Sequence, residues 1–362
     1  MTSPQKIKLT LSPEAERYVR RDAPADVRRM AARGALPLPP TELATVLFAL
    51  SHDPDAEVKQ TARESLEGLP ESVAESVVTG DTHPAVLGYL AHAWKDDGDR
   101  MERLALNHAT DDHTFAFLAT LPHRRVVEIA SQNQERLLRA PEIVDALGEN
   151  PLTGRATIDR ILSFLGVDRP EAEVVEETPI EEAADPEALT DEAAAEALRA
   201  FLGDDSSAFA SELLEEIDGE LDPEQQGNLY ALVQQMNVMQ KIKLARMGNK
   251  EARGLLVRDR NKLIATAAIR SPKMTDNEVE GYSRARNVSD DVLRTIAMNR
   301  EWTRNYQVKL GLATNPKCPI NQAVKFINFL QERDLRNVMK SKDVPSAVAM
   351  HARRLLQKKG KI

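Results

Sequence analysis

Short apolar stripes with helical spacing, separated by turns, are the feature that most limits how this chain can fold. Between positions 41 and 50, apolar residues fall at i, i+3, i+4 and i+7, one face of a helix: Leu43, Val46, Leu47 and Leu50. After the turn Ser51-His52-Asp53-Pro54, a second stripe places Val58, Ala62 and Leu66 four residues apart. Helices this short are marginally stable alone in water, so they must bury their apolar faces against neighbours. The pattern therefore predicts an all-α chain of stacked helices.

Capping residues predict where several of these helices begin. Ser12 precedes Pro13, and Glu14 and Glu16 lie near the positive end of the helix dipole, which favours a helix start. Thr41 is expected to cap the helix that contains Leu43. Weaker amphipathic segments follow at 84–94, 100–108, 113–121, 124–139 and 156–165. The first half of the chain is thus expected to be a series of short helices.

The second half of the chain contains recurring segments. Residues 271–277 (Ser-Pro-Lys-Met-Thr-Asp-Asn) recur 44 positions later at 315–321, and residues 291–296 recur 42 to 43 positions later at 334–338. A capping residue with an acid two positions on also recurs, at 249–251, 299–301 and 341–343. A period of 42 to 44 lies in the range of HEAT and armadillo repeats, which is about 40 to 47 residues.

Through these recurrences and the segment from Asp53-Pro54 to Leu66, the chain resembles HEAT-like α-helical repeat proteins. The resemblance implies an α-solenoid of helix pairs. It implies a fold and no particular activity, because one fold supports many functions. Aromatic residues make up only 4% of the chain, and there are only 16 glycines, which also disfavours a sheet protein.

Charge divides the chain into three parts. Residues 166–226 contain 21 acidic and 2 basic residues, a net charge of −19, whereas residues 227–362 contain 27 basic and 11 acidic residues, a net charge of +16. We expect a helical lobe at 1–166, an acidic linker with two short amphipathic helices at 167–226, and a basic helical lobe at 227–362. The opposed charges suggest that residues 171–224 shield the basic lobe from other anions.

Composition favours a cytoplasmic location. Cys318 is the single cysteine, so an intramolecular disulfide is impossible and nothing indicates an oxidising compartment. The first residues contain no apolar run of a secretory signal, and no stretch approaches the 18 apolar residues of a membrane span.

Motifs for enzymatic chemistry are weak or missing. His108 and His113 flank two aspartates, but a separation of five suits one helix face poorly, so we interpret this stretch as a turn between helices and not as a metal site. Neither glycine-rich phosphate-binding motif occurs. Cys318 lies in a turn that opens a helix, which can lower a thiol pKa, but a lone cysteine there is more often incidental. We therefore expect no catalytic residue, no metal and no cofactor.

Basic residues of the second lobe form the candidate binding surface. Those that recur across its repeats are Arg284, Arg286, Arg294, Arg300, Arg304, Lys309, Lys317 and Lys325. Trp302 and Tyr306, expected one helical turn apart, either stack on bases or, as their spacing favours, belong to the core. The favoured function is a non-enzymatic scaffold that holds a protein partner in the solenoid groove. The alternative is a nucleic-acid or polyanion-binding module that uses the basic lobe.

Overall fold

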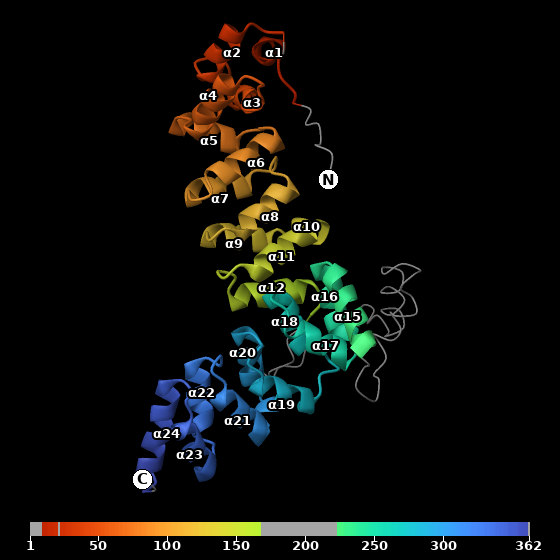
Figure 1. Cartoon of the computed structure of the whole chain (residues 1–362), viewed down its shortest axis with the longest axis vertical. Coiled ribbons are helices and arrows are strands. Elements are labelled where there is room, and N and C mark those ends of the chain that lie inside the picture. The colour runs from red at the N-terminus through yellow and green to blue at the C-terminus, as the bar shows by residue number, and fades with distance from the viewer. Residues whose placement is uncertain (1–8, 21, 168–222, 361–362) are drawn as a thin grey trace, which may run out of the picture. The chain divides into compact units, whose positions relative to one another are not determined.

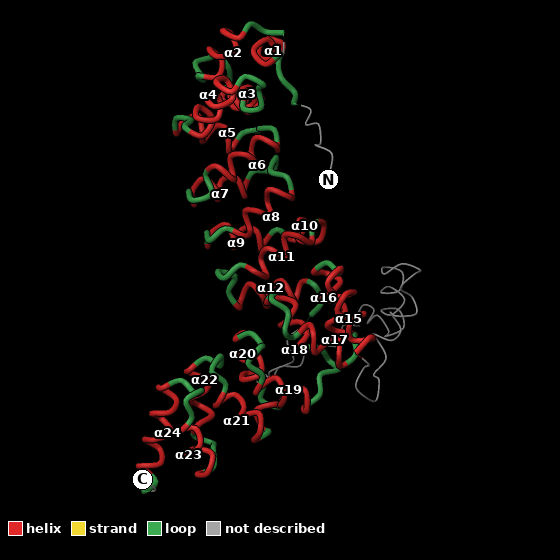
Figure 2. Tube along the Cα trace, viewed as in Figure 1, coloured by secondary structure: helices red, strands yellow, loops and turns green. Residues whose placement is uncertain are grey.

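The structure is a computed structural model that describes residues 9–20, 22–167 and 223–360. All regular elements within these ranges are helices, and Figure 2 shows only helices and loops there, so the predicted all-α class is confirmed. The acidic linker and the two short helices expected inside it lie almost entirely outside the described residues. No described helix is long and apolar enough to cross a lipid bilayer.

The chain divides into two compact units, Met1–Thr153 and Gly154–Ile362. The helices of the first unit, which follow one another in chain order in Figure 1, are α1 (Pro13–Val19), α2 (Ala25–Ala32), α3 (Pro40–Leu50), α4 (Ala56–Glu67), α5 (Glu71–Thr79), α6 (Pro84–Ala93), α7 (Gly98–Leu106), α8 (Asp112–Thr120), α9 (Arg124–Gln132), α10 (Gln134–Arg139) and α11 (Pro141–Glu149).

The second unit holds the remaining helices of the described residues. They are α12 (Arg155–Phe164), α15 (Pro223–Gln235), α16 (Val238–Met247), α17 (Lys250–Leu256), α18 (Lys262–Ile269), α19 (Asp276–Arg284), α20 (Asp290–Met298), the 3-10 helix η2 (Trp302–Arg304), α21 (Tyr306–Thr314), α22 (Ile320–Ile327), α23 (Glu332–Lys340) and α24 (Ser346–Lys358).

Local sequence signals explain most helix boundaries. Ser12 caps α1 as predicted, because its side chain accepts a hydrogen bond from the Ala15 N–H at 3.2 Å. The prediction for Thr41 is wrong. Proline at position 40 already has the backbone angle of a first helical residue, so α3 begins there and Thr41 lies inside its first turn. The segment expected at 124–139 is two helices, since Asn133 ends α9 and caps α10.

The predicted apolar stripes form the core. Val58, Ala62 and Leu66 are fully buried on α4, and Leu47 of α3 is fully buried too. In both units, most helices contact the next helix or the next but one along the chain, for example α5 with α7 and α19 with α21. Each helix is therefore stabilised mainly by neighbours that are close in sequence.

Buried asparagines join successive helices at their ends. The Nδ2 group of Asn150 donates to the carbonyls of Ala119 at 2.7 Å and Leu121 at 2.9 Å, at the end of α8. Asn107 makes the equivalent pair of contacts with the end of α5, and Asn315 does so with the end of α19. A buried amide side chain thus satisfies carbonyls that have no partner inside their own helix.

Side chains that join successive helices also explain the recurrence between 271–277 and 315–321. Ser271 donates to the carbonyl of Arg246 at 3.0 Å, and Asn315 donates to carbonyls at the end of α19. The recurrence spans three helices, because α18 corresponds to α21 and α19 to α22. From α16 to α24, successive α-helices begin 12 to 16 residues apart, so a recurrence at 42 to 44 residues corresponds to three α-helices with their turns.

Helix α12 packs within the second unit. It contacts α18, and the buried guanidinium of Arg270, at the end of α18, forms an ion pair with Asp159 of α12. The division between the units therefore falls before α12, although the sequence analysis grouped this helix with residues 1–166.

Candidate functional site

A cavity of about 390 Å³ lies between the α7–α8 turn and the short helix α10 in the first unit. Its lining residues are Ala105, Leu106, Asn107, His108, Asn133, Glu135, Arg136 and Arg139. We call it the α7–α10 cavity. Leu106 is 65% exposed at its edge, and Leu138 on α10 is 58% exposed.

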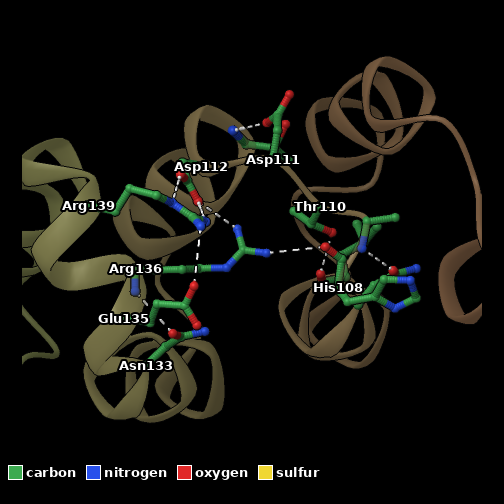
Figure 3. A network of polar contacts seen from close by, with 12 residues as sticks. His108, Thr110, Asp111, Asp112, Asn133, Glu135, Arg136 and Arg139 are labelled. Atoms are coloured by element: carbon green, nitrogen blue, oxygen red, sulfur yellow. Dashed lines mark hydrogen bonds and ion pairs between the residues drawn. The ribbon is translucent and has the colours of Figure 1, made fainter.

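An ion cluster, drawn in Figure 3, includes two of the residues that line this cavity, Arg136 and Arg139. Asp112 accepts hydrogen bonds from Arg139 Nε at 2.7 Å, from Arg139 Nη2 at 2.8 Å and from Arg136 Nη1 at 3.0 Å. The hydrogen bond from Arg139 and the nearby charge of Arg136 lower the pKa of the Asp112 carboxyl below its usual value. Asp112 therefore stays ionised at neutral pH and fixes α10 against the start of α8.

The two arginines differ in their exposure to solvent. Arg136 is mostly buried, with its guanidinium 4.6 Å from the centre of the Phe115 ring. Arg139 is 54% exposed, although its Nε and Nη2 already pair with Asp112 and its Nη1 with the exposed Glu135. Arg139 and the apolar Leu106 both line the cavity. The cavity thus offers one partly exposed cation and one exposed apolar side chain.

Residues 108–111 form a turn between helices, as interpreted from the sequence, whereas Asp112 and His113 already belong to α8. Thr110 donates its hydroxyl hydrogen to the Leu104 carbonyl at 2.7 Å, and Asp111 caps α8 by accepting from the Thr114 N–H at 2.7 Å. Across the residues that the structure describes, no three His, Cys, Asp or Glu side chains converge as metal ligands.

Three of the predicted basic residues are held in ion pairs of the second unit. Arg284 pairs with Glu280 at 2.9 Å and donates to Gln307 at 2.6 Å. Arg286 pairs with Asp343 at 2.8 Å, and Arg294 pairs with Asp290 at 3.5 Å. These ion pairs neutralise part of the positive charge that would attract a bound anion.

The other five predicted basic residues form no ion pair with a described acidic side chain. They are Arg300, Arg304, Lys309, Lys317 and Lys325. Lys309 lies 5.3 Å from the centre of the Phe329 ring, and Lys317 donates to the Val288 carbonyl at 3.2 Å. The cations that remain available therefore come from η2, α21, α22 and the turns beside them.

Trp302 and Tyr306 are not one turn apart on a single helix. Trp302 belongs to η2, whereas Tyr306 begins α21, and Asn305 between them caps α21. Both are only partly buried, so the favoured assignment to the core is wrong. Tyr306 donates its hydroxyl hydrogen to Asp334 and accepts from the Gln331 N–H at 3.1 Å, so it joins α21 to α23.

Cys318 is a buried residue. Only 3% of its surface is exposed, and burial raises the pKa of the thiol to about 12. The turn therefore does not lower the thiol pKa, and the thiol stays protonated at neutral pH.

Sequence reasoning missed the cluster of Asp112, Arg136 and Arg139. The arginines lie 24 and 27 positions after the aspartate, and the break of helix at Asn133 brings them back towards it. The only available signal was Asn133 inside an otherwise continuous helical segment, because asparagine is a strong capping residue.

Comparison with protein-family models, with curated proteins and with solved structures finds no match for the chain. The class that the structure itself defines is an all-α protein of short helices packed mainly on their sequence neighbours.

Proposed function

We propose that this chain is a non-enzymatic scaffold for protein–protein interaction, built as an α-solenoid of HEAT-like helix pairs in two lobes. Support comes from the packing of helices on neighbours close in sequence, and from the buried asparagines that join their ends. Such arrays present many side chains along continuous surfaces, which suits the binding of another polypeptide. The proposed location is the cytoplasm.

The observation that carries this proposal is the α7–α10 cavity. It combines an exposed apolar residue, Leu106 at the end of α7, with a partly exposed cation, Arg139 on α10, the helix that the ion cluster holds against α8. Preorganised side chains lose little conformational freedom when a partner binds, so more of the contact energy appears as affinity. The partner in this proposal is a protein segment with an apolar and an acidic side chain.

Affinity capture with matched variants tests the proposal. The full chain, Leu106→Asp and Met30→Asp are used as baits under identical conditions. Met30 is 49% exposed in the same unit and does not line the cavity, so it is the control. We expect a defined protein that the wild type and Met30→Asp recover, and that Leu106→Asp recovers at least about tenfold less, an effect near 1.4 kcal/mol. Equal recovery by all three baits contradicts the proposal.

A second candidate function is polyanion binding by the basic second unit. The observation in its favour is that Arg300, Arg304, Lys309, Lys317 and Lys325 form no ion pair among the described residues. Nuclease treatment in the same capture experiment distinguishes the two functions. Recovery of many proteins that disappears after nuclease treatment supports nucleic-acid binding.

A further inference from the structure

The last helices of the chain carry a large surplus of positive charge. Residues 300–360 contain 13 Lys or Arg and 4 Asp or Glu, a net charge of +9. Three of the four acids are already engaged: Glu332 with Arg336, Asp334 with Tyr306, and Asp343 with Arg286. Among the 13 cations, only Arg336 has an ion pair with a described acidic side chain. Such a surface attracts an anionic partner at long range.

Exposed apolar side chains lie on the same helices. Phe329, in the α22–α23 turn, is 64% exposed, and Met350 on α24 is 57% exposed. Lys309 of α21 lies 5.3 Å from the centre of the Phe329 ring. Asn328, next to Phe329, contacts His351, next to Met350, at 3.4 Å, so the turn meets the middle of α24.

A cation accompanies each of these apolar residues in the sequence. Arg354 is four residues after Met350 on α24, a separation that places both side chains on one side of the helix. Lys325 is in the last turn of α22, just before the turn that contains Phe329. Both cations are exposed. We call Lys309, Lys325, Phe329, Met350 and Arg354 the Phe329 surface. Its chemistry suits a partner that supplies carboxylates and apolar side chains together.

The chain itself contains such a partner. Residues 168–222 include 20 acidic and 2 basic residues, a net charge of −18, together with Phe201, Phe209 and Leu213. We propose that residues 168–222 bind the Phe329 surface within the same molecule. Covalent linkage gives the segment an effective concentration that can reach roughly millimolar, so a separate polyanion must compete with it. Length does not prevent the contact, because a fully extended chain of 55 residues reaches about 180 to 200 Å.

A nucleic acid is the main competing occupant, because phosphates would satisfy the same cations and a base can stack on Phe329. We favour the tethered segment because every molecule carries one copy of it. It also matches the apolar part of the surface, which a phosphate backbone does not. This contact is separate from the α7–α10 cavity and does not depend on the proposed scaffold function.

Carbodiimide cross-linking of the full chain at low salt tests the contact directly. The reagent joins a carboxylate to a lysine amine only when the two groups touch. We expect amide cross-links from residues 168–222 to Lys309 and Lys325 at least about fivefold more often than to Lys250. Lys250 is exposed and nearer in sequence, so it is the internal control. The cross-links should weaken above 0.1 M salt, where screening acts over about 10 Å. They should also weaken in Phe329→Ser, whose exposed side chain is not part of the core. Cross-links that favour Lys250, or that Phe329→Ser leaves unchanged, overturn the proposal.

Competition with a mixed-sequence 20-nucleotide single-stranded DNA gives an independent test. The second protein in this test is a full-length variant in which Glu and Asp between 168 and 222 become Gln and Asn. Fluorescence anisotropy at low salt should show that this variant binds the DNA at least tenfold more tightly than the wild type. If the wild type binds as tightly as the neutralised variant, the surface is open to nucleic acid and the proposal is wrong.

Discussion

Single buried polar side chains join neighbouring helices, and Asn315 is one of them. It is 3% exposed, donates to the carbonyls of Ser283 and Ala285, and accepts from the Lys317 N–H at 3.0 Å. An aliphatic side chain at this position leaves all three backbone groups without these partners, in a place that water reaches poorly.

We predict that Asn315→Ala lowers the free energy of unfolding by roughly 2 to 4 kcal/mol, because buried groups are left without hydrogen bonds. Asn321→Ala is the matched control, since Asn321 is exposed on α22, and its effect should stay within about 0.5 kcal/mol. Urea unfolding followed by circular dichroism measures both. Equal effects of the two substitutions would show that the buried amide contacts add nothing to stability.

Cys318 gives a second prediction at this scale. Because burial raises the pKa of its thiol to about 12, the reactive thiolate is only ~0.01% populated at pH 8. We therefore expect negligible labelling by a disulfide reagent in the native protein at pH 8, and complete labelling of one thiol in urea. Labelling should rise with pH and with denaturant. Rapid native labelling at pH 8 would contradict the buried position of the side chain.

At the scale of the helices, a buried ion pair joins α17 to α19. Arg253 Nη2 lies 2.9 Å from Glu278 Oε2, and both side chains are almost fully buried. Glu278 also accepts from the N–H of Thr275 at 3.0 Å and from its hydroxyl at 2.7 Å, so one carboxylate caps α19 and binds the neighbouring helix.

Removing Glu278 should be costly, because the buried Arg253 guanidinium loses its two hydrogen bonds to the carboxylate and the start of α19 loses its cap. We predict that Glu278→Ala destabilises the second unit by about 3 to 5 kcal/mol. Glu280→Ala is the control on the same helix, because the Glu280 pair with Arg284 is partly exposed, and it should cost at most about 1 kcal/mol. Thermal unfolding monitored by circular dichroism compares them. A large loss in the control alone would mean that α19 depends on its surface charges.

The sequence predicted helices best where a local signal was strong. The stripe of Val58, Ala62 and Leu66 is buried as expected, since spacing alone decides which face packs. The predictions for Thr41 and Trp302 are wrong because neighbouring residues determine where the helices begin. Pro40 begins α3, and Asn305 caps α21. The α7–α10 cavity was not predictable, because it depends on contacts between residues more than 20 positions apart.

At the scale of the whole molecule, charge and packing give different information. Charge patterns divide the chain at its acidic segment, whereas packing divides it between Thr153 and Gly154. Periodicity could not reveal this second boundary, because α12 looks like any other amphipathic helix. Its contact with α18 depends on residues that are 111 positions apart, Asp159 and Arg270.

Each helix is stabilised mainly by its sequence neighbours, so damage to one unit should not spread to the other. Amide hydrogen exchange on the full chain measures this, with Val58→Asp in the first unit and Leu293→Asp in the second. Both native side chains are fully buried, so each substitution places a charge in a core and should cost several kcal/mol. We predict that Leu293→Asp accelerates exchange in α20 and its neighbouring helices and leaves residues up to Thr153 at wild-type rates. Val58→Asp should accelerate exchange in α4 and its neighbouring helices and leave residues from Gly154 onward at wild-type rates. Accelerated exchange throughout both units after either substitution would contradict the account, because it would require a single shared core.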